Sequence, residues 1–459
     1  MNASNKVVRL GLKTAFSYVG RNPDKNLPML MDWVDKIAGD GPNSYEVQRK
    51  AFRKVIDEPE NNMHKLLWSV WDDIDEGVLK KLFENFVINA NLMGWPKEEE
   101  LRKKYNCNIP WTILMDPTSA CNLHCTGCWA AEYGNRLNLS FDEIDSIITQ
   151  GKEMGVYFYI YTGGEPLVRK NDLISICRKH NDCVFLCFTN STLIDEEFAN
   201  EMLDVKNFIP AISVEGFEKS TDARRGSGTY SKVVKAMNLL KSKKLPFGIS
   251  CCYTSQNLDS ISSDEYFDQM VSWGAKFVFY FHYMPVGNDA VPALMPSPAQ
   301  REFMYHKIRE VRATKPLFAM DFQNDGEYVG GCIAGGRRYF HINANGDADP
   351  CVFIHYSNAN IRNNTLLEIL RSPLFQAYHD GQPFNDNHLR PCPMLENPEK
   401  LRKMVKDSDA KSTDMQSPES ADHLCDKCEN YAANWKPKAN ELWVNSVRGK
   451  SWKEGSKNK

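Results

Sequence analysis

The chain has 459 residues, of which 42% are hydrophobic and 25% charged, and its formal net charge is −3. This length predicts two or three domains, and the small net charge gives no indication of a nucleic-acid partner. No apolar run approaches the roughly 18 residues of a membrane span, and Arg9 and Lys13 interrupt any signal peptide. Without an export signal, the 14 cysteines favour metal ligation in a reducing cytoplasm over a disulfide framework.

The first part of the chain, residues 1–108, is predicted to be helical. Residues 78–88 place apolar side chains near positions i, i+3 and i+4, as an amphipathic helix does. We expect Gly94 to end this helix and Pro96 to begin the next one. Residues 6–21 mix apolar with basic side chains, so they form either a helix packed on its own protein or one that contacts a membrane surface.

After residue 108, short apolar runs alternate with amphipathic segments, which favours a parallel sheet with helices between its strands. The expected strands cover residues 111–115, 156–161, 184–189, 208–214, 247–253 and 276–283. The expected helices cover residues 141–154, 171–179, 195–203, 230–241 and 263–273. Six such units predict an α/β fold with a partial (βα)6 TIM-like barrel, whose chemistry belongs at the rim formed by the carboxyl ends of the strands.

Three cysteines follow the first expected strand: Cys121, Cys125 and Cys128, spaced C-x₃-C-x₂-C. Gly127 lets the loop wrap tightly, so the three thiolates can hold three irons of one [4Fe–4S] cluster. A complete cluster normally has four protein thiolates, and the remaining iron would be open to a substrate or cofactor. The alternatives are a zinc knuckle or buried thiols, although the spacing lacks the paired C-x₂-C of most zinc sites.

A second motif, Gly163-Gly164-Glu165-Pro166, follows the second expected strand. Its glycines let the backbone approach a ligand closely, and the carboxylate of Glu165 can bind an ammonium or hydroxyl group. Taken by itself, the motif also fits an ordinary turn.

The cysteine motif and the Gly-Gly-Glu-Pro motif, each placed after a strand, resemble those of radical S-adenosylmethionine (SAM) enzymes. The resemblance implies a catalytic [4Fe–4S] cluster whose open iron binds the amino and carboxylate groups of SAM, with the Glu165 loop contacting the amino group. It also implies reductive cleavage of SAM to a 5′-deoxyadenosyl radical that abstracts hydrogen from a substrate. The electrons for this oxidoreductase-type chemistry would come from an external donor such as ferredoxin or flavodoxin.

Weaker motifs end the later strands. The turn at Asn190 resembles the Thr-Asn-Gly turn of these enzymes, with Ser191 in place of the glycine, and implies a SAM contact. Ser213 and Glu215 are implied to approach the ribose or the methionine end of SAM, and Arg225 to pair with its carboxylate. Residues 284–287 resemble the loop that lies against adenine. The alternatives for these positions are capped turns and a solvated arginine.

A second group of cysteines begins after residue 330. Cys332 and Cys351, in the pattern C-x₁₃-G-x₄-C, resemble the opening of the SPASM or shorter twitch extension of radical SAM enzymes. This implies one auxiliary [4Fe–4S] cluster, held by these two cysteines and two of Cys392, Cys425 and Cys428. A cluster closed by four thiolates would conduct electrons, and one with an open iron could bind substrate. The missing C-x₂-C-x₅-C-x₃-C stretch argues against a second auxiliary cluster.

The alternative for the late cysteines is a structural zinc bound by Cys392, Cys425, Cys428 and either His423 or His388. Five earlier cysteines fall on expected strands or helices and are interpreted as packing residues: Cys177, Cys183, Cys187, Cys251 and Cys252. We also expect a hairpin over residues 338–351, a polar loop over 406–422 and a disordered tail from residue 449.

Four regions are therefore predicted: a helical N-terminal region at 1–108, a radical SAM core barrel at 109–315, a small C-terminal cysteine-rich iron–sulfur extension at 316–435, and a C-terminal tail at 436–459. The expected substrate is a peptide or protein, the usual substrate of SPASM-bearing relatives. One alternative is a small molecule or a lipid, the latter favoured if residues 6–21 contact a membrane. Another is a non-catalytic electron carrier, although such a carrier needs no Gly-Gly-Glu-Pro loop.

Overall fold

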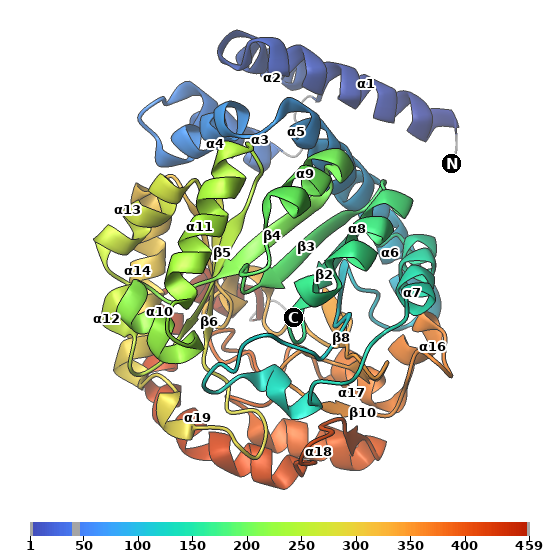
Figure 1. Cartoon of the computed structure of the whole chain (residues 1–459), viewed down its shortest axis with the longest axis vertical. Helices are drawn as coiled ribbons and strands as arrows, with labels where there is room; N and C mark the ends of the chain where they lie inside the picture. Colours follow the sequence, from blue (N-terminus) through green and yellow to red (C-terminus); the bar gives the residue numbers. More distant parts are fainter. Residues whose placement is uncertain (1–2, 39–45, 457–459) are drawn as a thin grey trace.

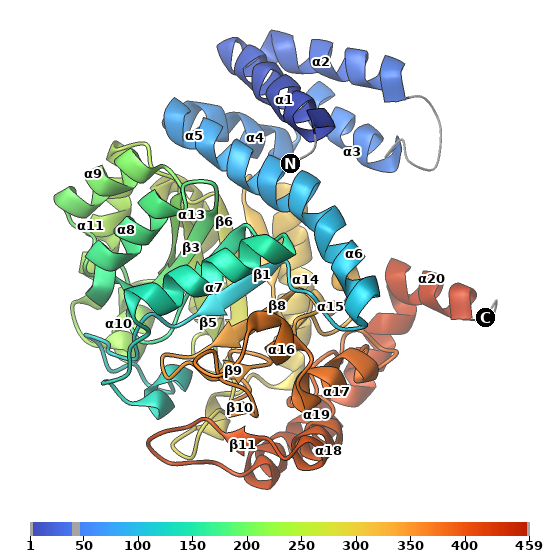
Figure 2. The ribbon, with the colours of Figure 1, turned by 90° about the vertical axis from the view of Figure 1, so that its right-hand side faces the viewer.

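The computed structural model describes residues 3–38 and 46–456. Its N-terminal part is helical, as predicted (Figures 1 and 2). The helices are α1 (Ala3–Arg21), α2 (Pro23–Ala38), α3 (Glu46–Asp57), α4 (Asn62–Asp73), α5 (Glu76–Leu82), the π-helix η1 (Phe83–Gly94) and α6 (Trp95–Tyr105). They have a small core of their own, made of Val19, Leu27, Met31 and Ile56.

The described part of α1 packs on the protein itself. The ring of Phe16 stacks on Phe83 with the centroids 4.0 Å apart, and Arg9 forms an ion pair with Glu84. The side chains of residues 6–8 lie outside the described residues. Membrane contact through residues 6–21 therefore stays a prediction.

The expected helix end at Gly94 is wrong. Gly94 has helical backbone angles, and η1 continues directly into α6, which has Pro96 in its first turn. A Cβ atom at Gly94 would lie 2.2 Å from the carbonyl oxygen of Gly155. Glycine is therefore required here by close packing against the loop before β2 and not by a helix stop.

A nine-stranded sheet forms the centre of the molecule. Its strands are β1 (Thr112–Met115), β2 (Phe158–Tyr161), β3 (Val184–Thr189), β4 (Phe208–Ser213), β5 (Gly248–Tyr253), β6 (Phe277–His282), β7 (Phe318–Asp321), β8 (Tyr339–Ile342) and β9 (Ala348–Asp349). Their order is β7-β6-β5-β4-β3-β2-β1-β8-β9, and only the β8–β9 pair is antiparallel. The six predicted strands are confirmed, and they form a parallel partial barrel that β7 and β8 extend at its two sides.

Helices cover the outer face of this sheet (Figure 1). They are α7 (Phe141–Met154), α8 (Lys170–Lys179), α9 (Glu196–Val205), α10 (Glu218–Arg225), α11 (Thr229–Ser242), α12 (Leu258–Ile261), α13 (Asp264–Trp273) and α14 (Pro298–Thr314). Ser140 begins α7 with a capping box that includes Glu143. The five predicted helices are confirmed, and α10, α12 and α14 were not predicted.

The two faces of the sheet differ in exposure because side chains alternate along a strand. Val278 and Tyr280 of β6 belong to the large outer core and are fully buried. Phe279 and Phe281 of the same strand point to the inner face and are only half-buried, as is Phe188 of β3. The helices seal the outer face, whereas the inner face keeps an apolar, partly accessible surface.

The C-terminal part folds against the open side of the barrel (Figure 2). It contains α15 (Gly326–Val329), α16 (Leu366–Leu370), α17 (Pro373–Gly381), α18 (Pro398–Ser408), α19 (Ala421–Asn445), α20 (Val447–Ser456) and the small strands β10 (Tyr356–Ser357) and β11 (Lys411–Ser412). The predicted hairpin is confirmed as β8–β9, with Gly346 at φ +83° in its turn. Because β8 also pairs with β1, the central sheet continues past residue 315.

The predicted tail is largely wrong over the described residues. Residues 436–445 belong to α19, and α20 continues to Ser456. Trp435 of α19 is fully buried, and the ring of Trp452 packs on His388 with the centroids 4.6 Å apart. These contacts order the segment through aromatic packing. The predicted polar loop begins only after Ser408, where α18 ends. Among the described helices, none is long and apolar enough to cross a membrane.

Candidate active site and auxiliary cavity

Cys121, Cys125 and Cys128 lie in the loop that follows β1, as half-buried free thiols. Gly127 has φ +65°, and a Cβ atom there would lie 2.4 Å from the ring of Tyr283 after β6. Only glycine lets the loop pack this closely across the rim of the barrel. The loop therefore presents three thiols at the carboxyl ends of the strands, a donor set that fits the irons of an iron–sulfur cluster.

The Gly-Gly-Glu-Pro loop supports the cysteine loop. A Cβ atom at Gly164 would lie 2.3 Å from the carbonyl oxygen of Ala120. The Gly164 N–H donates to the Thr118 carbonyl at 3.1 Å, and the Glu165 N–H donates to the Ala120 carbonyl at 2.8 Å. The close approach that requires glycine is thus to the backbone just before Cys121, whereas the sequence suggested an approach to a ligand.

The Glu165 carboxylate is buried and accepts three hydrogen bonds. It accepts hydrogen bonds from the Thr189 hydroxyl at 2.6 Å, from the Asn190 N–H at 2.7 Å and from the Leu167 N–H at 3.0 Å. Burial raises the pKa of Glu165, and these hydrogen bonds oppose the rise. Pro166 begins the short helix η3 (Pro166–Arg169) directly after it. Glu165 therefore joins the loop after β2 to the loop after β3.

Asn190, in the loop after β3, contacts the cysteine loop directly. Its Nδ2 donates to Asn122 Oδ1 at 2.8 Å, and Asn122 Nδ2 donates to the Thr192 hydroxyl at 2.8 Å. Ser191 has φ +58°, so it occupies the left-handed conformation that suits the glycine of the related turn. Asn122, the residue after Cys121, is thus fixed by the β3 loop.

Glu215 is a fully buried carboxylate that holds two arginines. Arg225 donates to it through Nε at 2.5 Å and through Nη2 at 2.6 Å, and Arg224 donates through Nη1 at 2.7 Å. Burial raises the pKa of Glu215, but the two guanidinium groups outweigh burial and lower it. The carboxylate expected to approach the ribose or the methionine end of SAM thus binds two arginines in this structure. Ser213, at the end of β4, remains half-buried at this edge.

Of these two arginines, Arg225 also contacts a cysteine of the loop. Its remaining Nη1 lies 3.9 Å from Cys125 Sγ, and the Thr126 N–H donates to the Arg224 carbonyl at 2.9 Å. The loop of residues 284–287 packs on the segment after Cys128, where a Cβ atom at Gly287 would lie 2.2 Å from Glu132, and the Gly287 N–H donates to Glu419 at 3.0 Å. The structure therefore brings the cysteine loop together with the supports from Glu165, Asn190 and Arg225.

A buried network that the sequence did not indicate joins this site to the C-terminal part. His341 of β8 lies with Nε2 2.9 Å from Asp116 Oδ1 and with Nδ1 3.4 Å from Asp349 Oδ2, and the Tyr133 hydroxyl donates to Asp349 at 2.9 Å. Burial lowers the pKa of His341, but the two carboxylates outweigh it and raise the pKa to about 9. Asp116 and His341 are far apart in the sequence. They meet because β8 pairs with β1 in a register that places His341 beside Leu114.

Cys332, Cys351 and Cys392 line one cavity beside this network. The rest of its lining is mostly apolar and includes Phe322 and Phe353. Burial raises the pKa of Cys332 to about 11 and that of Cys351 to about 12. Three thiols in an apolar enclosure suit a soft metal centre such as an iron–sulfur cluster.

The other two late cysteines lie on α19. Cys425 and Cys428 are both buried, and the Cys425 thiol donates to the Pro398 carbonyl at 3.3 Å. Neither lines the cavity of Cys332, Cys351 and Cys392.

The residues of the zinc alternative are dispersed. His388 packs on Trp443 and Trp452, while His423 forms an ion pair with Glu419. Cys392 lies with Cys332 and Cys351. Over residues 3–38 and 46–456, no three His, Cys, Asp or Glu side chains gather around a point where they could hold one metal ion.

Trp129 connects the two groups of cysteines. It directly follows Cys128, and its ring centroid lies 6.2 Å from that of Phe353 and 5.8 Å from that of His341. Phe353 lines the auxiliary cavity.

Of the cysteines interpreted as packing, all are buried except Cys252, which is half-buried at the end of β5.

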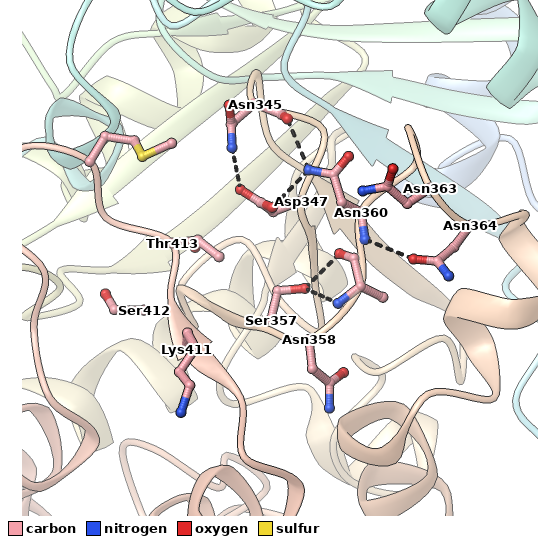
Figure 3. Close-up of a pocket in the computed structure, with 12 residues that line it drawn as sticks. Asn345, Asp347, Ser357, Asn358, Asn360, Asn363, Asn364, Lys411, Ser412 and Thr413 are labelled. Atoms are coloured by element: carbon pink, nitrogen blue, oxygen red, sulfur yellow. Dashed lines mark hydrogen bonds between the residues drawn. The ribbon is translucent and has the colours of Figure 1, made fainter.

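A separate polar cavity of about 390 Å³ lies between the β8–β9 turn and β11 (Figure 3). Asparagines dominate its lining, and Asn360 Nδ2 donates to Asp347 Oδ1 at 2.8 Å and to the Asn345 carbonyl at 3.0 Å. No cysteine lines this cavity.

The comparisons with known proteins agree with this geometry. Residues 115–263 match the model of the radical SAM superfamily, so the chain contains a radical SAM domain. Residues 332–394 match the SPASM model, an iron–sulfur cluster-binding domain, so a SPASM domain follows the radical SAM domain in this chain. These domains bind SAM and a [4Fe–4S] cluster, with auxiliary iron–sulfur clusters in the SPASM part.

Relatives cover much of the chain at low identity. The PqqA peptide cyclase of Granulibacter bethesdensis is 25% identical over 62% of this chain and 79% of its own length. The AdoMet-dependent heme synthase of Methanosarcina barkeri is 24% identical over 57% of this chain and 82% of its own. The crystal structure of Streptococcus suis SuiB bound to S-adenosylmethionine shares the fold, with a TM-score of 0.54, 20% identity, and coverage of 67% of this chain and 79% of SuiB.

Proposed function

We propose that this enzyme cleaves SAM reductively and abstracts hydrogen from a carbon of a peptide or protein substrate. The observation that carries the proposal is the convergence, at one rim of the barrel, of the three thiols of the cysteine loop with a fixed arginine, Arg225. When bound, the [4Fe–4S] cluster and SAM supply the electron and the 5′-deoxyadenosyl radical that the reaction requires.

The residues of the chain have separate roles in this proposal. Cys121, Cys125 and Cys128 hold the catalytic cluster. Arg225 offers its Nη1, which lies 3.9 Å from Cys125 Sγ, to the SAM carboxylate, since Glu215 fixes the other side of the guanidinium group. Glu165 positions the loops around the cluster through its three hydrogen bonds.

The inner face of the barrel supports hydrogen abstraction from an apolar part of the substrate. Phe188 packs on Phe279 and Phe281 with centroids 5.5 and 5.8 Å apart, and all three rings are half-buried. Such a wall excludes water from reactive intermediates and binds an apolar side chain.

A peptide substrate is favoured by the relatives. One is a PqqA peptide cyclase, and SuiB, which shares the fold, has been solved bound to its precursor peptide SuiA. The second candidate is a small apolar molecule, favoured by the relationship to AdoMet-dependent heme synthases and by the same aromatic wall. Reducing equivalents would come from an external donor such as ferredoxin or flavodoxin, in a cytoplasmic setting.

The reaction is tested by anaerobic reconstitution of the enzyme with iron and sulfide, followed by SAM and dithionite. We expect 5′-deoxyadenosine to form. Its absence from protein with full cluster content would overturn the proposal.

The substrate class is tested with an extract of deuterium-labelled host cells separated by molecular size. We expect the peptide and protein fraction to place deuterium in the 5′-deoxyadenosine. Transfer only from the small-molecule fraction would overturn the peptide assignment and favour the second candidate.

A further inference from the structure

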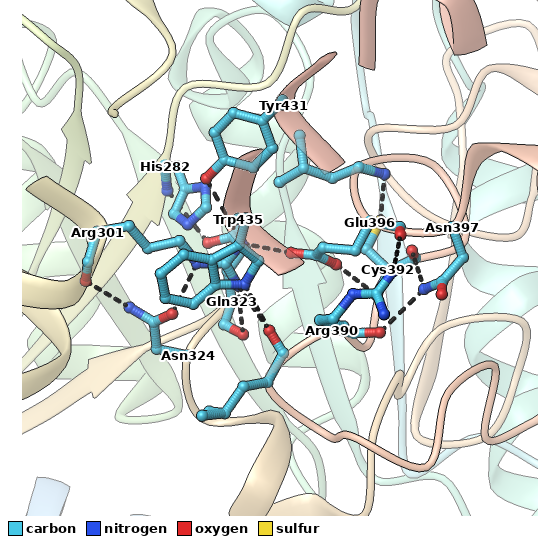
Figure 4. Close-up of polar contacts among 12 residues, drawn as sticks. His282, Arg301, Gln323, Asn324, Arg390, Cys392, Glu396, Asn397, Tyr431 and Trp435 are labelled. Atoms are coloured by element: carbon cyan, nitrogen blue, oxygen red, sulfur yellow. Dashed lines mark hydrogen bonds and ion pairs between the residues drawn. The ribbon is translucent and has the colours of Figure 1, made fainter. Parts of the chain in front are cut away.

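A buried ion pair lies directly behind Cys392 (Figure 4). Arg301 of α14 and Glu396 both have fully buried side chains, and Arg301 Nη1 donates to Glu396 Oε1 at 2.6 Å. The other carboxylate oxygen, Oε2, accepts the Cys392 N–H at 2.7 Å. One carboxylate therefore joins a helix of the barrel to the backbone of a cysteine in the auxiliary cavity.

Arg301 is itself held rigidly. Its Nε donates to Asn324 Oδ1 at 2.8 Å, and its guanidinium carbon lies 4.2 Å from the ring centroid of Trp435 in α19. The Trp435 Nε1–H and Arg301 Nη2 both donate to the Leu389 carbonyl, at 2.9 and 3.3 Å. These contacts come from three separate segments, so the arginine has one position relative to the barrel.

The chain turns around Cys392 so that its sulfur faces the cavity. The Leu395 N–H donates to Cys392 Sγ at 3.4 Å, and Asn397 donates to the Cys392 carbonyl through its N–H at 3.1 Å and through Nδ2 at 3.0 Å. Cys332 and Cys351 reach the same cavity from the segment around β8. Cys392 comes from a distant segment, so its position depends on what holds residues 392–397.

We propose that Glu396, fixed by Arg301, is a positioning residue that places Cys392 as the third thiolate ligand of the auxiliary cluster. The inference rests on the auxiliary cluster of the SPASM domain. Placing a charged pair in the protein interior costs desolvation, and an apolar pair of similar volume is often as stable. What this pair provides is the hydrogen bond from the Cys392 N–H to Glu396, which an apolar pair cannot make. Residues that orient metal ligands in this way typically change metal affinity about 10–100-fold when removed.

The test removes the catalytic cluster so that iron reports the auxiliary site alone. In full-length protein with Cys121→Ala, Cys125→Ala and Cys128→Ala, we compare Glu396→Leu, Glu396→Gln and the double variant Arg301→Met/Glu396→Leu. Each protein is reconstituted and measured for iron and sulfide per chain, for the electron paramagnetic resonance spectrum of the reduced cluster, and for melting temperature.

Glu396→Leu is expected to lower auxiliary iron at least twofold when iron is limiting, in line with the ~10–100-fold range of affinity changes. Glu396→Gln, which keeps an acceptor for the Cys392 N–H, is expected to retain most of the iron. The double variant is expected to recover melting temperature, since no buried charge is left unpaired, but not iron. Glu327→Leu is the matched control: it removes another buried partner of α14, paired with Arg309, and is expected to lower stability without changing the spectrum.

Full iron and an unchanged spectrum in the double variant would overturn the inference, because the pair would then be structural only. Absence of iron from the parent triple-cysteine variant would overturn the auxiliary cluster itself. Neither result bears on SAM cleavage, which the 5′-deoxyadenosine assay measures separately.

Discussion

Arg225 points its Nη1 at Cys125 Sγ, 3.9 Å away, while Glu215 binds the other side of the same guanidinium group through two hydrogen bonds. The carboxylate is fully buried and also binds Arg224. A cation beside the cysteine loop is thus held in one orientation before any ligand arrives. Preorganised charge of this kind lowers the cost of binding an anionic group.

Glu215→Gln is expected to lower SAM cleavage. The substitution removes the charge that holds Arg224 and Arg225, and hydrogen bonds to charged groups contribute about 1.5–3 kcal/mol, which corresponds to about 10–100-fold in the rate. The measurement is 5′-deoxyadenosine formation at saturating dithionite. Glu218→Gln, an exposed position on α10, the helix that carries Arg224 and Arg225, is the control, and an equal loss in both variants would contradict the assigned role of Glu215.

Gly164→Ala is expected to displace the cysteine loop, because the added Cβ would lie 2.3 Å from the Ala120 carbonyl oxygen. We expect a stability loss of about 1–3 kcal/mol and a loss of iron from the catalytic site, measured by denaturant unfolding and iron analysis. Gly11→Ala in α1, where a Cβ atom meets nothing within 4 Å, should leave both unchanged or gain about 0.5–1 kcal/mol. Normal iron in Gly164→Ala would contradict the proposed support of the loop.

His341 gives a pH dependence with a definite sign. Its pKa in the folded protein is raised to about 9 by Asp116 and Asp349, against about 6.5 in an unfolded chain. Its contribution is therefore fully present below about pH 6.5 and is lost as the pH rises to about 9, by at most about 3 kcal/mol. The measurement is the difference in unfolding free energy between the wild type and His341→Asn from pH 6 to 9. A difference that stays constant or grows with pH would contradict a charged His341.

The sequence predicted the barrel well because its strands are short apolar runs bounded by turns, as in residues 184–189, which match β3 at both ends. It missed the position of β8 beside β1, since a four-residue strand such as Tyr339–Ile342 does not encode its neighbour. It also misjudged Gly94, because the close approach to Gly155 is a tertiary contact. Local pattern predicted the elements, and packing decided where they join.

In the site, too, local spacing predicted single motifs, whereas contacts between distant segments were not predicted. The spacing of Cys121, Cys125 and Cys128 predicted the loop that the structure places at the rim of the barrel. The pairing of Glu215 with Arg225 depends on how α10 folds back on β4, and the meeting of Cys392 with Cys332 and Cys351 depends on a cavity formed by separate segments. Sequence spacing carries no signal for either relationship.

The most direct test of the account compares Cys125→Ala with Cys392→Ala under identical anaerobic reconstitution. Each substitution removes one thiol from one of the two groups of cysteines, and 5′-deoxyadenosine is measured with SAM and dithionite alongside iron content. We expect Cys125→Ala to form no 5′-deoxyadenosine above background, while Cys392→Ala loses auxiliary iron and still forms 5′-deoxyadenosine. Wild-type product from Cys125→Ala, or a Cys392→Ala enzyme that keeps its catalytic iron yet is equally inert, would contradict it.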